Sequence, residues 1–304
     1  MKIAILSNGN ANYSTKRLKE EALLRGHEVS IIKYKNCFVS IEGGKPTVFY
    51  KGKPLEYYDA IIPRIATKMT KYGTTILRQL EASGAWALSS SLAINRARDK
   101  IRSIQVLAKT SGIGIPKTVL SQNSSDIDEL INQVGGTPVV IKVAQGTHGN
   151  GVVLAETKKA AKSVLQALQV FDNSGASIFI QEFIEESAGT DIRAFVVGGR
   201  VVASMERKSL DDDFRSNLHK GGLGKIIKLT NEEKKMAVKA ARAMGLAVAG
   251  VDLMRSNKGP IVLEVNASPG FGIEHVTKRN VAKAIIKYVE LNAKRGRKKD
   301  RVGV

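Results

Sequence analysis

The stretch VDLMRSNKGPIVLEVNASPG, residues 251–270, holds two apolar segments on either side of a short polar turn. Residues such as Ser, Asn, Gly and Pro favour a tight turn, so the two segments are expected to pair as antiparallel strands. A turn centred near Lys258 places Asp252 roughly opposite Glu264. Glu264 and Asn266 lie two residues apart on one strand, so their side chains point to the same face.

Two carboxylates that face each other across a sheet repel. A hard divalent cation removes this conflict, and Asp252, Glu264 and Asn266 all offer the oxygen ligands that such a cation takes. The alternative interpretation is a polar strand face in solvent with a loose register. The turn sequence ASPG follows at residues 267–270, so we expect a fixed edge to the site.

A second candidate is the glycine-rich loop in VVIKVAQGTHGNGVV, residues 139–153. Glycines let backbone N–H groups approach phosphate oxygens, and Lys142 supplies a point charge at the end of an apolar strand. The motif is not a P-loop, because GxxxxGK[ST] does not occur in the chain. A plain hairpin with a flexible loop is the alternative.

Three further segments carry polar residues that could serve a site. Arg215, in FRSNLH at residues 214–219, could clamp a phosphoryl or carboxylate group, although a surface loop is the simpler interpretation. The segment IFIQEFI, residues 178–184, ends beside polar residues, but a core strand is favoured. Asp191 and Arg193 share a strand face, where an ion pair is as plausible as a ligand contact.

Strand and helix signals alternate over the first 95 residues. Strands are expected at residues 3–6, 29–32 and 60–62, and helices at 16–25 and 74–83. Such alternation predicts a parallel sheet covered by helices. No GxGxxG follows the first strand, so the dinucleotide-binding fingerprint is absent.

Residues 90–112 are predicted to form one long helix, and the pattern changes after Pro116. Hairpins then dominate, which predicts an α+β region with helices packed on antiparallel strands. The expected strand pairs are 139–143 with 151–155, 192–197 with 200–206, and 248–254 with 261–266, and the expected helices are 125–134, 158–170, 231–244 and 279–293.

The chain has 304 residues and a net charge of +20, which favours anionic partners without choosing among them. The single cysteine, Cys37, excludes a disulfide framework and a CxxC zinc site. No HExxH or GxSxG motif occurs, and no apolar run is long enough to span a membrane. We therefore expect a cytoplasmic protein without a membrane partner.

Taken in order, several motifs resemble those of the ATP-grasp ligases, and in particular the RimK-like α-L-glutamate ligases, which add glutamate to the C-terminus of a small-subunit ribosomal protein. The resemblance runs from residue 1 to about residue 289. The motifs are RDK at 98–100, VIK at 140–142 with its glycine loop, QEFI at 181–184, DIR at 191–193, FRSN at 214–217, VD at 251–252 and LEVNASPG at 263–270.

The resemblance implies an α/β and α+β protein, with a Rossmann-like N-terminal domain at residues 1–95 and a two-subdomain ATP-grasp fold. The central subdomain would span residues 96–185 and the C-terminal subdomain residues 186–293. Residues 294–304, KRGRKKDRVGV, would be a basic flexible tail. ATP would lie between the two ATP-grasp subdomains.

The resemblance also implies a role for each matched residue. Lys100 and Lys142 would contact the phosphates of ATP. Gln181, Glu182, Phe183 and Ile184 would surround the adenine, and Asp191 would hold the ribose. Arg193, Arg215 and Asn217 would face the transferred phosphate as catalytic residues. Asp252, Glu264 and Asn266 would bind Mg²⁺, with Mn²⁺ as a substitute, as two ions.

The function so implied is ATP-dependent addition of L-glutamate to the C-terminus of a ribosomal protein or peptide, through an acyl-phosphate. The same chemistry on another amino acid, a carrier protein, a cofactor or free glutamate is the alternative. An alternative of another class, supported only by the charge, is a non-enzymatic protein that binds RNA or the ribosome. The resemblance further implies a homo-oligomer, as a tetramer. We expect Arg64 and residues 211–224 to influence substrate choice.

Overall fold

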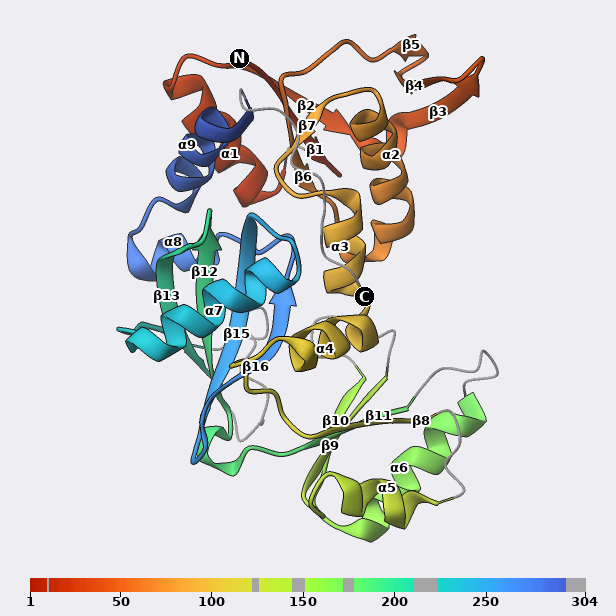
Figure 1. Cartoon of the computed structure of the whole chain (residues 1–304), viewed down its shortest axis with the longest axis vertical. Helices are drawn as coiled ribbons and strands as arrows, with labels where there is room; N and C mark the ends of the chain where they lie inside the picture. Colours follow the sequence, from red (N-terminus) through yellow and green to blue (C-terminus); the bar gives the residue numbers. More distant parts are fainter. Residues whose placement is uncertain (10, 122–125, 144–150, 172–177, 210–222, 294–304) are drawn as a thin grey trace.

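We describe the chain in a computed structural model, in which three structural units lie one after another along the longest axis (Figure 1). The structure describes residues 1–304 except for 10, 122–125, 144–150, 172–177, 210–222 and 294–304. The N-terminal unit lies at one end, a five-stranded sheet in the middle, and a smaller four-stranded unit at the other end.

The N-terminal unit contains the parallel sheet that the sequence predicts. Its strand order is β2-β1-β6-β7, and helices α1 and α2 accompany the sheet. The strands are β1 (Lys2–Ser7), β2 (Glu28–Lys33), β6 (Ala60–Arg64) and β7 (Trp86–Ala87), and the helices are α1 (Tyr13–Leu24) and α2 (Thr70–Ala82).

A second, antiparallel sheet in this unit was not predicted. It consists of β3 (Cys37–Glu42), β4 (Lys45–Tyr50) and β5 (Lys53–Pro54). Gly43 and Gly44 join the first two strands with φ angles of 55° and 72°, the left-handed conformation that a two-residue hairpin turn requires. This Gly-Gly pair between two apolar segments is the signal from which the hairpin could have been predicted.

The prediction of one helix over residues 90–112 is wrong. The segment forms two helices, α3 (Ser91–Arg98) and α4 (Lys100–Lys109), which are separated at Asp99. Asp99 takes an extended conformation, with φ −78° and ψ 104°, and its carboxylate accepts a hydrogen bond from the backbone N–H of Arg102 at 3.0 Å. An aspartate in this role caps the start of a new helix, which is why the first helix cannot continue through it.

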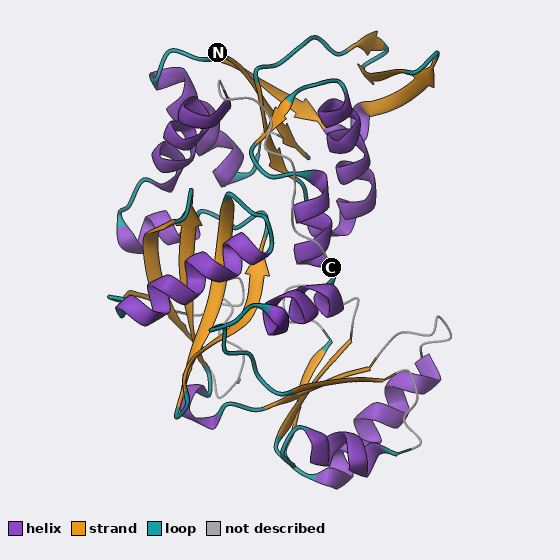
Figure 2. Cartoon of the chain, viewed as in Figure 1, coloured by secondary structure: helices purple, strands orange, loops and turns teal. Residues whose placement is uncertain are grey.

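The smaller unit is a four-stranded antiparallel sheet of order β10-β9-β11-β8, with two helices on one face (Figure 2). Its strands are β8 (Thr118–Ser121), β9 (Val139–Val143), β10 (Val152–Ala155) and β11 (Ile178–Glu182), and its helices are α5 (Ile127–Gln133) and α6 (Lys158–Phe171). The pairing of β9 with β10 confirms the predicted hairpin.

The middle unit is a five-stranded antiparallel sheet of order β14-β13-β12-β15-β16, and its two predicted hairpins are confirmed. Its strands are β12 (Thr190–Val197), β13 (Arg200–Lys208), β14 (Leu223–Ile226), β15 (Val248–Ser256) and β16 (Gly259–Asn266). Its helices are α7 (Asn231–Ala243), α8 (Gly272–Thr277) and α9 (Val281–Ala293). Within the described ranges, no helix combines the length and the apolar character needed to cross a bilayer.

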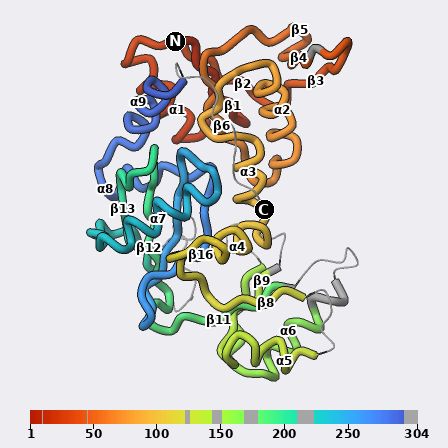
Figure 3. The backbone as a smooth tube through the Cα atoms, viewed as in Figure 1, coloured from red at the N-terminus to blue at the C-terminus, as the bar shows by residue number. Residues whose placement is uncertain are grey.

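The N-terminal and middle units share their hydrophobic core, whereas the smaller unit has its own. One buried cluster contains Ile3 and Leu18 together with Phe195 and Ile285, and a second also draws on both units. The tube in Figure 3 shows why: after the middle unit the chain runs back to the N-terminal unit, where α9 lies beside α1. Residues of the smaller unit form a separate cluster around Ile131 and Ile141.

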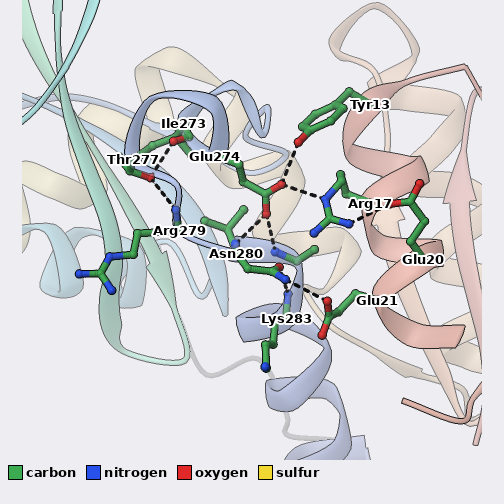
Figure 4. Close-up of polar contacts among 12 residues, drawn as sticks. Tyr13, Arg17, Glu20, Glu21, Ile273, Glu274, Thr277, Arg279, Asn280 and Lys283 are labelled. Carbon is green, nitrogen blue, oxygen red and sulfur yellow. Dashed lines mark hydrogen bonds and ion pairs between the residues drawn. The ribbon is translucent and has the colours of Figure 1, made fainter. Parts of the chain in front are cut away.

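Glu274 joins the two units that share a core (Figure 4). Its buried carboxylate accepts hydrogen bonds from Tyr13 Oη at 3.2 Å and Arg17 Nε at 3.1 Å, both on α1. It also accepts from the backbone N–H groups of Val281 at 2.7 Å and Ala282 at 3.1 Å, at the start of α9. A single carboxylate therefore caps α9 and anchors it to the N-terminal unit.

Candidate active site

The two carboxylates predicted to face each other do so in the middle sheet. Asp252 on β15 pairs with Glu264 on β16, although the turn lies between Ser256 and Gly259 and would by itself align Asp252 with Leu263. The register shifts by one residue next to Asp252, where Leu263 forms a bulge that brings Glu264 into line. The bulge therefore creates the carboxylate pair.

Asn266 bridges the pair, as the spacing on one strand face predicts. Its amide Nδ2 donates to Glu264 Oε1 at 2.8 Å and to Asp252 Oδ2 at 3.3 Å. Desolvation by the surrounding chain and the charge of Asp252 raise the pKa of Glu264, even though water reaches this side chain. Desolvation is the larger of the two causes, and a cation between the two carboxylates would relieve the second one, their repulsion.

Asp252 is buried and is also the centre of a cationic network. Arg193 donates to both carboxylate oxygens, with Nη2 at 2.8 Å from Oδ2, and Arg207 Nη2 lies 3.0 Å from Oδ2. Burial alone would raise the pKa of Asp252, but the two arginines lower it to about 2. Asp252 is therefore a permanent anion that two arginines hold in place.

Arg207 is a site residue that the sequence reasoning missed. It forms a bidentate ion pair with Asp191, with Nε 2.5 Å from Oδ1, and it is buried together with Asp191. The predicted hairpin ended at Glu206. A turn at the two glycines 198 and 199 without a bulge would align Glu206 with Asp191. A register shift after Phe195 places Arg207 there instead.

Asp191 therefore has a strong partner within the protein. Desolvation raises the pKa of Asp191 and the nearby Asp252 adds to this, while Arg207 opposes both. Arg193 pairs with Asp252 rather than with Asp191 on its own strand. Contact of Asp191 with a ribose stays a prediction, and it would require the carboxylate to share its hydrogen bonds with Arg207.

Two lysines lie close enough to Glu264 to sense its charge. Lys142 on β9 donates from Nζ to Gln181 Oε1 at 2.7 Å, and desolvation lowers its pKa to about 8. The charge of Lys100, at the start of α4, lowers this pKa further, and that of Glu264 opposes the shift. Desolvation also lowers the pKa of Lys100, again opposed by Glu264. The predicted phosphate ligands and the carboxylate pair thus form one electrostatic cluster.

The segment predicted to surround an adenine is the end of β11 and the residues after it. Gln181 is buried, and its Nε2 donates to Thr118 Oγ1 at 2.9 Å, so its amide is fixed between two side chains. Glu182 Oε1 accepts the backbone N–H of Lys117 at 2.8 Å. Phe183 is half-buried and Ile184 is buried. Their role in binding a nucleotide stays a prediction.

Several predicted site residues lie outside the described part of the chain. These are Arg215 and Asn217, the loop glycines 146 and 149, the glycines 221 and 222, and the basic tail 294–304. Gly151 and Gly224 are described, at the start of the β10 region and on β14.

The loop after β16 connects the carboxylate pair to the N-terminal unit. Arg64 Nη2 donates to Pro269 O at 2.8 Å, and Arg98 Nη2 donates to Ser268 Oγ at 3.3 Å. Pro269 also lies against Gly250, beside Arg193: a Cβ built on Gly250 would meet Pro269 Cβ at 2.9 Å and Arg193 Cδ at 3.1 Å. Only glycine fits at position 250, so the strand can pass directly under the loop.

The donor set fits a hard divalent cation. Among the residues that the structure describes, no three His, Cys, Asp or Glu side chains form a metal cluster. The third oxygen ligand beside Asp252 and Glu264 would therefore come from the amide of Asn266. Carboxylate and amide oxygens are the ligands of Mg²⁺ rather than of zinc. Lys142 and Lys100 lie beside this set, as they would to bind phosphates of a nucleotide that the cation also contacts.

Comparison with known proteins agrees with this geometry. Residues 97–289 match the family model described as the RimK-like ATP-grasp domain, and residues 1–94 match the RimK PreATP-grasp domain. A protein of Coxiella burnetii named "Probable alpha-L-glutamate ligase" is 54% identical over 97% of both chains. A protein of Teredinibacter turnerae with the same name is 51% identical over 99% of both chains.

Solved structures show the same fold at low sequence identity. The ATP-grasp ligase PsnB, solved with a precursor variant, Mg and ADP, aligns with a TM-score of 0.73 at 18% identity, covering 96% of this chain and 98% of PsnB. D-alanine–D-alanine ligase from Bacillus anthracis, solved with ATP, aligns with a TM-score of 0.65 at 19% identity, covering 97% and 98%. The predicted fold class is confirmed. The chain belongs to the RimK-like ATP-grasp family and is an ATP-dependent ligase that forms carbon–nitrogen bonds.

Proposed function

We propose that this enzyme adds L-glutamate to the C-terminal carboxylate of a protein or peptide, at the expense of ATP. The observation that carries the proposal is the cluster of Asp252, Glu264 and Asn266 beside Lys142, because it combines cation ligands with a charge for phosphate. The names of the relatives from Coxiella burnetii and Teredinibacter turnerae support glutamate as the amino acid.

The reaction we propose runs through an acyl-phosphate. An acceptor carboxylate oxygen attacks the γ-phosphorus of ATP, a P–O bond forms, and ADP leaves. The amine of glutamate then attacks the activated carbonyl carbon, the C–N bond forms, phosphate leaves, and the nitrogen gives up its proton. A carboxylate needs this activation because oxide is too poor a leaving group. No covalent enzyme nucleophile is required.

The residues of this chain position and neutralise the reactants. Asp252, Glu264 and Asn266 would hold Mg²⁺, which supplies charge stabilisation on the phosphate oxygens when bound. We propose that two such ions bind and that Mn²⁺ can replace Mg²⁺. Lys142 and Lys100 would bind phosphate oxygens, and Arg215 and Asn217 would face the transferred group. Arg193, now paired with Asp252, would offset the charge that develops during transfer.

The acceptor and the assembly belong to the same proposal. A ribosomal protein C-terminus is the acceptor we favour, and contact with the ribosome or RNA would use the net charge of +20. Another amino acid, a carrier protein, a cofactor or free glutamate would use the same site. A homotetramer is also proposed. A purely RNA-binding role is supported only by the charge, and the ligase family together with the carboxylate pair argues against it.

The test is ligation of a peptide in the presence of ATP, Mg²⁺ and each amino acid in turn. We expect release of ADP and phosphate and a mass increase equal to one glutamate residue, or a multiple of it, on the acceptor. Mass spectrometry of intact ribosomal proteins after the same incubation would identify the natural acceptor. Absence of ADP release with every amino acid would overturn the proposal.

A further inference from the structure

Two arginines of the N-terminal unit converge on the loop that follows the carboxylate pair. Arg64 lies at the end of β6, and Arg98 lies at the end of α3. Arg64 Nη2 donates to Ser14 Oγ at 2.9 Å and to Pro269 O at 2.8 Å. Arg98 donates to Ser268 Oγ at 3.3 Å, to Thr70 Oγ1 at 2.8 Å, and to the backbone oxygens of residues 65 and 66.

All of these partners are neutral. Within the described residues, neither arginine forms an ion pair, whereas Arg193, Arg207 and Arg25 all face carboxylates. Burial lowers the pKa of both Arg64 and Arg98 to about 10, and the charge of Arg98 contributes at Arg64. Two neighbouring desolvated cations without a counter-ion are unfavourable, and an anionic ligand would supply the missing charge.

The surroundings of Arg64 favour an anion. Arg64 stands at the carboxyl end of a parallel strand, the edge at which open parallel sheets bind ligands. Ser14 belongs to the first turn of α1, which contains no acidic residue, so the positive end of the helix dipole adds to the potential. Phe271 packs against the guanidinium, with Arg64 Cζ 5.1 Å from the ring centre, which fixes its plane.

The pair is near the carboxylate cluster but separate from it. Ser268 follows Asn266 by two residues, so their Cα atoms are at most about 7 Å apart. Pro269 lies between Arg64 and Arg193, since it accepts from the first and packs beside the second across Gly250. A molecule bound at Arg64 and Arg98 would therefore reach the reacting groups without displacing a cation ligand.

We propose that Arg64 and Arg98 bind the carboxylates of the incoming amino acid that do not react. This inference rests on the proposed function. The amine of glutamate must reach the activated carbonyl while both of its carboxylates remain free, so the substrate presents two anionic groups to be held. Within the described residues, Nη1 and Nε of Arg64 form no hydrogen bond and can donate to a carboxylate. Both Nη atoms of Arg98 already donate to protein oxygens, so Arg98 would share these hydrogen bonds and contribute mainly its charge.

Steady-state kinetics of Arg64→Gln and Arg98→Gln test the assignment. We expect KM for glutamate to rise by about tenfold or more in each variant, while KM for ATP stays within about twofold. Arg78→Gln, an exposed position on α2, removes the same charge and should change neither value. Arg64→Lys and Arg98→Lys keep the charge and should recover part of the affinity for glutamate, and an unchanged KM for ATP in the glutamine variants shows that they are folded.

Substrates that lack one carboxylate give a second readout. Glutamine and glutamate α-amide, which each lack one carboxylate, should be poor substrates of the wild type. In each glutamine variant, the preference for glutamate over one of these two analogues should shrink, because the arginine that would bind the missing carboxylate is already absent. Unchanged KM for glutamate in both variants of an active enzyme would overturn this inference and leave the proposed function standing. A wild type that ligates no amino acid would overturn the proposed function instead.

Discussion

Asp252 and Glu264 face each other, yet their surroundings give them different tasks. Asp252 is buried and accepts hydrogen bonds from Arg193, Arg207 and Asn266, so it holds the strands together as well as contributing an oxygen ligand. Glu264 is reached by water, and Asn266 is its main hydrogen-bond donor. Loss of Asp252 should therefore damage folding, and loss of Glu264 should damage catalysis.

Glu264→Gln is expected to lower kcat by about 100-fold or more, because the amide keeps the shape but loses the charge that would bind Mg²⁺. Its melting temperature should stay close to that of the wild type. Asp252→Ala is expected to destabilise the fold by about 3 kcal/mol, since it leaves two arginines without their carboxylate. Activity is measured by coupled ADP assay, and stability by thermal and urea unfolding.

Glu42→Gln, at an exposed position on β3, is the control for the change of charge and should leave both quantities as they are. Full activity of Glu264→Gln would show that the cation is not held at this carboxylate.

The pKa of about 8 at Lys142 predicts that nucleotide binding is linked to protons. Phosphates favour the charged lysine, so binding raises this pKa, and the protein should take up a proton between about pH 8 and pH 10. Affinity for the nucleotide should therefore fall as pH rises above 8. Calorimetric titration in buffers of different ionisation enthalpy measures the uptake, which Lys142→Gln should abolish. An uptake that persists in this variant would exclude Lys142 as its source.

At the scale of the strand, two bulges decide which residues meet. The sequence correctly pairs the hairpins β12–β13 and β15–β16, because apolar segments around Gly, Asn and Pro are strong signals. It does not show where one extra residue enters a strand. The shift after Phe195 brings Arg207 to Asp191, and the shift at Leu263 brings Glu264 to Asp252. The pair of Asp191 and Arg207 was therefore missed. The pair of Asp252 and Glu264 was predicted, but from a turn centred near Lys258 rather than from a bulge.

At the scale of the helix, Asp99 separates α3 from α4. Apolar periodicity continues through residues 90–112, so the break depends on a local competition that periodicity does not report. The carboxylate of Asp99 offers the N–H of Arg102 a better partner than continued helix does, and Lys100 thereby becomes the first residue of a new helix near Glu264.

Asp99→Ala is expected to lower the free energy of unfolding by about 1 kcal/mol and also to raise KM for ATP, because Lys100 loses its fixed position. Thr230→Ala removes the cap of α7, where the Thr230 side chain accepts from the N–H of Glu233 at 3.1 Å, and should cost similar stability without affecting ATP. Urea unfolding and initial rates measure both effects. An equal change of KM for ATP in the two variants would mean that Asp99 affects ATP binding only through the stability of the fold.

At the scale of the molecule, Glu274 fastens the N-terminal unit to the middle unit. Glu274→Ala leaves Arg17 Nε and the first N–H groups of α9 without their acceptor, so we expect a loss of about 3 kcal/mol in denaturant unfolding. Glu20→Ala removes the exposed partner of the same arginine and should cost less than about 1 kcal/mol. Comparable losses would show that Glu274 contributes no more to stability than an exposed ion pair does.

The net charge of +20 predicts a salt-dependent reaction with an acidic acceptor. Attraction between the protein and a glutamate-tailed peptide weakens as salt screens it, so kcat/KM should fall by about threefold or more between about 0.05 and 0.3 M salt. Residues 294–304 contribute six basic side chains and one acidic one. Their deletion should leave peptide ligation unchanged if they serve only to anchor the enzyme elsewhere. A salt-independent rate would argue against electrostatic steering.

The packing of α9 on α1 also determines when the first domain can be finished. A ribosome makes α1 early and α9 near the end of the described chain, and domains commonly fold in the order in which they are made. Here Leu18 and Ala22 of α1 share one buried cluster with Ile285 and Val289 of α9. The parallel sheet covers part of the apolar face of α1, but α9 covers the rest only after the middle sheet has been synthesised, so the first unit to be translated is among the last to be completed.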